Sequence, residues 1–210
     1  MNLISKYTLI ILIVLFSGSC GQKQTDQILN VDSEDIGRIA VFAFQKSNSI
    51  ENIDNVDLFE FTEYFYFSLK QKLDNKLLVE YSKISREFDL LRNKKPDYSY
   101  NQLLNEISKS NNAEFYISGF IKEYKERVGS DLGVSSPASV DIEIELVNVK
   151  TGQIIWSYRF NQSQLPLLYD ISRIKKFIKR KGKWITADSL LKEGLDESAI
   201  NLNNFLRKKN

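Results

Sequence analysis

The chain has 210 residues, with one cysteine, Cys20, and no histidine. Lack of histidine removes the commonest general base at neutral pH, and it excludes serine–histidine catalysis, cysteine–histidine catalysis and standard zinc sites. A single cysteine cannot form an intramolecular disulfide or a thiolate metal cluster. The sequence also contains no glycine-rich phosphate loop of the Walker or dinucleotide type. We therefore predict no cofactor, no resident metal and no enzymatic activity.

Carboxylates are the remaining side chains with catalytic chemistry, and Glu143 and Glu145 stand two residues apart. A pair of carboxylates can hydrolyse a glycosidic bond. The surrounding segment, however, alternates apolar and acidic residues from position 138 to 149. This alternation predicts a half-buried strand whose acidic face is solvated, where carboxylates ordinarily serve solubility.

A basic run precedes the C-terminal helical segment, interleaved with Ile174, Phe177 and Ile178. As a functional surface it could contact phospholipid headgroups, lipopolysaccharide, anionic cell-wall polymers or an acidic partner. The structural alternative is the solvated face of an amphipathic helix. The run and the aromatic residue after it are Arg173, Lys175, Lys176, Lys179, Arg180, Lys181, Lys183 and Trp184.

The N-terminus has the three parts of a secretion signal. Lys6 supplies the positive charge, residues 7–16 are apolar, and small residues 17–19 lead to Cys20. The apolar run of about ten residues is half of what a membrane-spanning helix needs. The string FSGSC resembles the bacterial lipobox, with Ser17 in place of its usual aliphatic residue. We predict a signal peptide over 1–19 and lipidation of Cys20, which anchors the chain to a membrane through its acyl chains.

Removal of residues 1–19 takes away one charge, that of Lys6, and changes the net charge from +2 to +1. Near-neutrality favours neither nucleic acid nor a strongly anionic membrane surface as a partner. Gly21 after the lipidated cysteine favours the outer membrane, facing the periplasm. Polar residues up to position 35 predict a flexible tether over 20–35, followed by one domain over 36–210.

Hydrophobic periodicity predicts the elements of this domain. Strands are expected at 38–44, 77–81 and 113–125, followed by a hairpin of 138–149 and 153–161 around a Lys-Thr-Gly turn. Helices are expected from Asp57 as N-cap, over 100–110 and over 187–207. In the third strand we expect both faces to be covered, with Tyr116, Phe120 and Tyr124 on one of them. The order predicts an α/β fold: a single domain with a mixed sheet of about five strands and helices packed on it.

Several strings between positions 119 and 194 resemble a family of small lipoproteins of Gram-negative bacteria. They are YKERVG, SPASV, VNVKTGQIIW, FNQSQLPL, FIKRKGKWIT and LLKEGL. At coarser range, the glycine-containing strand followed by a strand, a TG turn and a tryptophan strand looks like lipoproteins that activate penicillin-binding proteins. It is also similar to curli-secretion-channel and TolB-N-terminal-like α/β domains. The resemblance implies non-enzymatic docking on an envelope partner, and it transfers no binding residue to this chain.

The residues that carry the resemblance also have structural interpretations. Glu126 and Arg127 are expected to form a bridge where the third strand ends, and Gly129 to supply a turn. Gln164 is expected to help fix the exit from the hairpin, and Trp156 to lie in the core or dock a helix.

The sequence is consistent with three functions. The first is a lipid-anchored binding or assembly module for a periplasmic or outer-membrane protein partner, of undetermined oligomeric state. The second is an auxiliary lipoprotein of a lipid-transporting ABC system, with a groove for acyl chains. The third is a lipid-anchored carboxylate hydrolase of cell-wall glycans.

Overall fold

A computed structural model describes residues 37–130, 133–163 and 184–208. The predicted signal peptide, Cys20, the tether, Gln164 and the basic run up to Lys183 lie outside the described residues. In the described parts of the chain, no helix is long and apolar enough to cross a membrane.

The described elements follow the predicted order except over 75–94, where a 3-10 turn and a helix replace the predicted second strand and the polar stretch after it. They are β1 Ile39–Val41, β2 Gln45–Lys46, α1 Asn55–Lys70, a 3-10 turn Asn75–Leu77, α2 Tyr81–Lys94, α3 Tyr100–Ser110, β3 Phe115–Lys125, β4 Val128–Gly129, β5 Val134–Ser136, β6 Ser139–Asn148, β7 Ile154–Ser163 and α5 Ala187–Arg207. The predicted hairpin and the predicted helices over 100–110 and 187–207 are confirmed.

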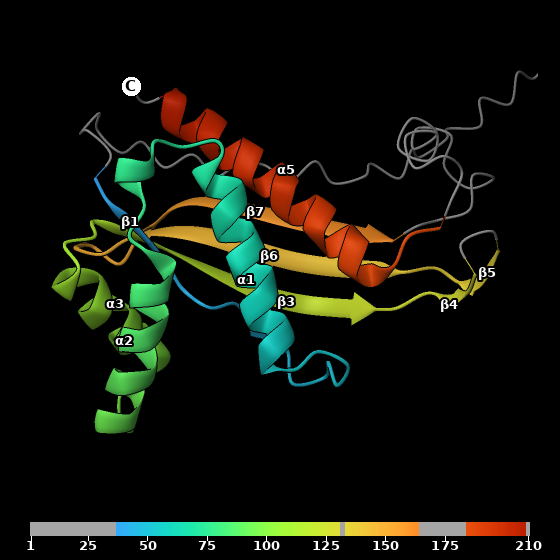
Figure 1. The fold of residues 1–210 in the computed structure, drawn as a ribbon, viewed down its shortest axis with the longest axis horizontal. Helices are drawn as coiled ribbons and strands as arrows, with labels where there is room; N and C mark the ends of the chain where they lie inside the picture. Colours follow the sequence, from blue (N-terminus) through green and yellow to red (C-terminus); the bar gives the residue numbers. More distant parts are fainter. Residues whose placement is uncertain (1–36, 131–132, 164–183, 209–210) are drawn as a thin grey trace, which may run out of the picture.

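The main sheet has five strands and mixed direction. Its order is β1-β3-β6-β7, and β2 also pairs with β3. β1 and β2 run parallel to β3, whereas β3, β6 and β7 form an antiparallel meander. β4 and β5 make a separate two-stranded ribbon (Figure 1). The predicted α/β fold, a single domain with a mixed five-stranded sheet, is confirmed.

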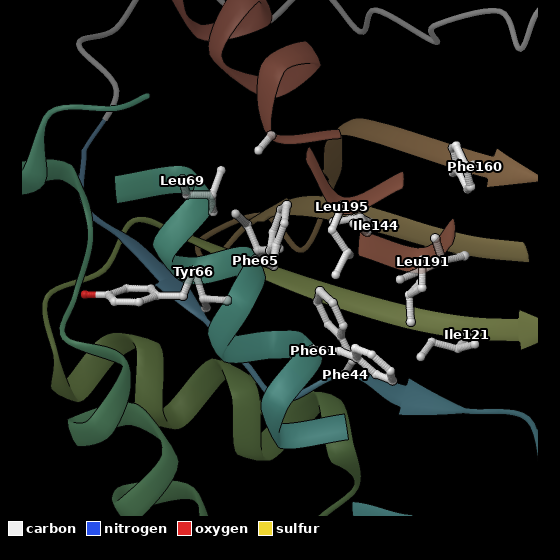
Figure 2. Close-up of a cluster of buried hydrophobic side chains, with 14 of the residues drawn as sticks. Phe44, Phe61, Phe65, Tyr66, Leu69, Ile121, Ile144, Phe160, Leu191 and Leu195 are labelled. Carbon is white, nitrogen blue, oxygen red and sulfur yellow. The ribbon is translucent and has the colours of Figure 1, made fainter. Parts of the chain in front are cut away.

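Helices α1 and α5 lie together across one face of the sheet (Figure 1). Figure 2 shows Phe61 and Phe65 of α1 and Leu191 and Leu195 of α5 in one cluster with Ile144 of β6. All five side chains are buried, which removes their apolar surface from water and supplies the main stabilisation of the fold.

Helices α2 and α3 form a second, smaller cluster on the opposite face of the sheet. Their buried residues Ile84, Leu104 and Ile107 pack with Phe42 and Tyr116, whose rings meet edge to face at 5.9 Å. This cluster covers only the end of the sheet where β3 begins and β6 ends. The described helices therefore cover the two faces of the sheet unequally.

The strand predicted over 77–81 is wrong. Only Leu78 forms a bridge, to Ile39, and Tyr81 already begins α2. The signal for α2 is the helical spacing of Tyr81, Ile84, Phe88 and Leu91, which the strand predicted over 77–81 obscured. The predicted first strand is also shorter than expected. As β1, it pairs with β3 only as far as Val41.

Two local predictions fail for reasons of backbone geometry. A bulge between Ile121 and Glu123 reverses the alternation of β3, so Tyr124 packs against Phe61 on the α1 side instead of sharing a face with Tyr116. Helix α1 begins before Asp57. The Asp54 N–H donates to Asp57 Oδ2 at 2.9 Å and the Asp57 N–H donates to Asp54 Oδ1 at 3.0 Å.

Gly119→Ala is expected to destabilise the fold by about 1–3 kcal/mol, the usual cost of overpacking a core. A Cβ at Gly119 would lie 2.4 Å from Cδ1 of the buried Phe44 ring. Urea unfolding measures the change. Gly133→Ala is the control, since nothing lies within 4 Å of a Cβ there. Equal stability of the two variants would contradict the proposed contact.

Candidate functional site

The candidate site is the part of the sheet that no described helix covers, on the face opposite α1 and α5. We call it the open face. In register across β3, β6 and β7, one row holds Ser118, Glu145 and Ser157. The next row holds Phe120, Glu143 and Arg159, and beyond it lie Lys122, Glu123, Asp141 and Asn161.

Phe120 is the aromatic side chain of the open face. Its side chain is 40% exposed, although a strand buried on both faces was expected here. The prediction is correct for Tyr116, which α2 and α3 cover, and wrong for Phe120, four residues further along β3. An exposed phenylalanine among charged side chains is a common centre for a protein interface.

Asp141 is held by two neighbouring side chains on β7. Arg159 donates to it through Nε at 2.9 Å and Nη2 at 2.5 Å, and Asn161 Nδ2 donates at 3.0 Å. The Asp141 residue is only 6% exposed, so the sequence prediction of a fully solvated acidic face is wrong at this position. The hydrogen bond to Asp141 raises the pKa of Arg159. A two-pronged pair of this kind fixes the guanidinium plane.

Two further carboxylates of the open face also have cationic partners. Glu143 pairs with Lys122. Glu123 accepts a hydrogen bond from the Ser139 hydroxyl and lies 3.1 Å from Lys125 Nζ. The Ser139 hydrogen bond, with Lys125 second, lowers the pKa of Glu123.

Glu145 differs from these three carboxylates. It has no hydrogen bond or ion pair with another described residue, and its cross-strand neighbours are Ser118 and Ser157. Partial burial raises the pKa of the Glu145 carboxyl, and repulsion from Glu143 adds to the rise, while Lys122 opposes it. Glu145 is therefore a carboxylate that forms no ion pair with another described residue and whose charge Lys122 offsets only in part.

Glu126 and Arg127 do not bridge to each other through their side chains. Glu126 Oε2 accepts a hydrogen bond from the Ala187 N–H at 3.0 Å, and Arg127 Nη1 donates to the Trp184 carbonyl. Glu126 thereby places a carboxylate at the N-terminus of α5, where the helix dipole favours it. The two residues connect the end of β3 to the start of α5.

The other resemblance residues inside the described parts are also built into the fold. Gly129 has φ of +123° and pairs with Val134 in the β4–β5 ribbon. The buried Trp156 donates through Nε1 to Asn201 Oδ1 of α5 at 2.9 Å. These placements are those of structural residues, at joints between the sheet and α5.

Catalysis by the carboxylates of the open face gains no support from their placement. Glu143 and Glu145 lie two residues apart on one strand, and Glu143 is paired with Lys122. Glycosidases instead place two carboxyl groups on either side of a bound sugar. Among the described residues, no group of three or more acidic, histidine or cysteine side chains could hold a metal ion.

Comparisons with known proteins give only distant likeness. No protein-family model matches the sequence, and no curated protein matches it. The PelC dodecamer subunit of Paraburkholderia phytofirmans is 14% identical, with a TM-score of 0.45 over 80% of this chain and 86% of that chain. The LpoB C-terminal domain of Escherichia coli is 18% identical, with a TM-score of 0.43 over 65% and 90%.

Lipoprotein GNA1162 of Neisseria meningitidis is 9% identical, with a TM-score of 0.42 over 69% of this chain and 93% of that chain. At these identities and TM-scores the likeness carries no argument about function.

Arg127→Ala is expected to lower the free energy of unfolding by about 1 kcal/mol, because it removes the hydrogen bond to the Trp184 carbonyl at the start of α5. Chemical denaturation measures the loss. The control is Lys125→Ala, at a side chain that is 72% exposed and forms only a surface ion pair. Unchanged stability of Arg127→Ala would indicate a ligand-binding role instead.

Glu145→Gln is expected to stabilise the chain at neutral pH. The folded-state pKa of Glu145 is raised, so its charge opposes folding above that pKa and has no cost below the unfolded-state pKa. Because part of the carboxyl still contacts water, we expect a gain of only about 0.5 kcal/mol near pH 7 and none near pH 4.

Urea unfolding at the two pH values tests this expectation, with Glu60→Gln on exposed α1 surface as the control. A loss of stability for Glu145→Gln at neutral pH would mean that Glu145 has a stabilising partner in the folded chain.

Proposed function

We propose that this protein is a lipid-anchored binding or assembly module of the bacterial cell envelope, which docks on a periplasmic or outer-membrane protein. The observation that carries the proposal is the open face. One face of the sheet is filled by α1 and α5, whereas the other presents Phe120 and Glu145 beyond the edge of α2 and α3.

The expected lipid anchor determines where the partner must lie. Lipidation of Cys20 after cleavage of the signal peptide holds the mature chain of 191 residues at a membrane. The predicted tether of 16 residues reaches about 50–60 Å when fully extended. The partner therefore lies at, or close to, the same membrane, which we assign to the outer membrane on its periplasmic side.

The binding role also agrees with the energetics of the site. A carboxylate that destabilises the free chain is a frequent mark of a functional surface, because the cost is recovered when a ligand compensates the charge. The other carboxylates of the open face, those of Glu123, Asp141 and Glu143, bind lysine, arginine, serine or asparagine side chains. Glu145 is the exception.

Membrane fractionation with in-cell crosslinking tests this function. In its host, the wild-type chain is expected in the outer-membrane fraction, crosslinked to one dominant envelope protein. Cys20→Ser is expected to move the chain out of that fraction and to reduce the crosslinked product by at least about tenfold, since anchoring raises the local concentration of the partner.

Asn210→Ser, at the far end of the sequence, is the control variant and should behave as wild type. Retention of Cys20→Ser in the membrane would contradict the anchor. A correctly anchored chain that yields no protein adduct would contradict the binding role. Co-purified phospholipid in native mass spectrometry would instead favour the auxiliary lipoprotein of a lipid-transporting ABC system.

A further inference from the structure

The open face also specifies what its partner must present, and this inference rests on the function proposed above. We propose that the open face is a docking surface for a protein partner that inserts an arginine side chain between Phe120 and Glu145. The inference follows from the register of the strands, the exposure of Phe120 and the lack of an ion pair at Glu145 among the described residues.

Phe120 and Glu145 are diagonal neighbours on adjacent antiparallel strands. Phe120 is directly opposite Glu143, and Glu145 follows two residues later on the same face of β6. Diagonal pairs of this kind have Cα atoms about 7–8 Å apart, which leaves room for one planar side chain to contact both. A single side chain from a partner can therefore reach the ring and the carboxylate together.

Arginine fits this pair better than any other side chain. Its guanidinium stacks on an aromatic ring and binds a carboxylate through two parallel hydrogen bonds. It has five N–H donors, and the Ser118 and Ser157 hydroxyls on either side of Glu145 make no hydrogen bond with another described residue. A lysine ammonium could pair with the Glu145 carboxylate, but it is not planar and cannot stack on the Phe120 ring as a guanidinium does.

The surrounding charges favour a protein over the other envelope ligands. Three carboxylates of the open face are paired with cations, and the remaining negative charge, that of Glu145, disfavours anionic lipid headgroups and polyanions. The pairs Lys122–Glu143 and Arg159–Asp141 flank Phe120, so the aromatic ring lies inside a polar border. An aromatic centre within a polar rim is the usual organisation of a protein–protein interface.

Site-specific photo-crosslinking of the full lipid-anchored chain in its host tests the inference. The photoreactive analogue p-benzoylphenylalanine replaces Phe120 and, as a matched control, Phe67, which is 50% exposed on α1. We expect a protein adduct from position 120 and none of that size from position 67. Mass spectrometry then identifies the crosslinked peptide of the partner, which should contain or adjoin an arginine.

Exchanging the charges of Glu145 and the partner's arginine tests whether the two side chains pair. Glu145→Gln is expected to weaken the purified complex about tenfold and Glu145→Arg to abolish it, whereas Glu60→Arg, on the exposed surface of α1, leaves it unchanged. Replacing the partner's arginine by glutamate should restore binding to Glu145→Arg. Because Glu145→Gln is expected to stabilise the free chain, lost binding cannot be attributed to unfolding.

The remaining outcomes separate this inference from the proposed function. The inference fails if the position 120 adduct does not depend on Glu145, is a lipid, or joins residues 164–183 of the same chain. It also fails if a protein adduct forms only at position 67, but then the binding function stands. If neither position yields a protein adduct and fractionated membranes yield none, both proposals fail.

Discussion

The close packing of α1 and α5 on one face of the sheet determines the character of both faces. A Cβ at Gly194 of α5 would lie 2.5 Å from Cδ1 of Phe160 on β7, so only glycine allows the helix to approach this strand so closely. Tyr64 and Ser68 of α1 donate to Asp196 of α5 at 2.9 and 2.7 Å, which holds the two helices together. Both long helices lie on this side, and among the described helices α2 and α3 are those on the opposite face, where they cover one end of it.

The unequal coverage explains why the open face is mostly ionic. Strands at the middle of a sheet need polar side chains wherever water reaches them, and pairs such as Asp141 with Arg159 satisfy one another there. Phe120 and Glu145 do not follow this pattern, since one is an exposed aromatic ring and the other a carboxylate that forms no ion pair with another described residue. Local departures of this kind from the rules of a stable surface are expected where a protein binds something else.

Periodicity in the sequence was enough to predict the meander and α5, because alternation at Val140–Leu146 and helical spacing at Leu191–Leu202 each reflect one buried face. The same spacing at Tyr81, Ile84 and Leu91 marks α2, which the strand predicted over 77–81 obscured. Periodicity was not enough for Tyr124, whose direction depends on a bulge. Exposure of Phe120 depends on where α2 and α3 end in space. The role of Arg127 likewise depends on the folded arrangement, because its hydrogen bond to the Trp184 carbonyl joins residues 57 positions apart.

Together, the anchor expected at Cys20 and the open face describe a chain held at a membrane with one side of its sheet directed to a partner. Hydroxyl-radical footprinting in native membranes and after purification tests this most directly, because Phe120 and Phe67 are both exposed in the free chain. We expect Phe120 to be labelled less in membranes than after purification, and Phe67 to be labelled equally in both. Equal labelling of Phe120 in the two preparations, or protection of Phe67 alone, would contradict it.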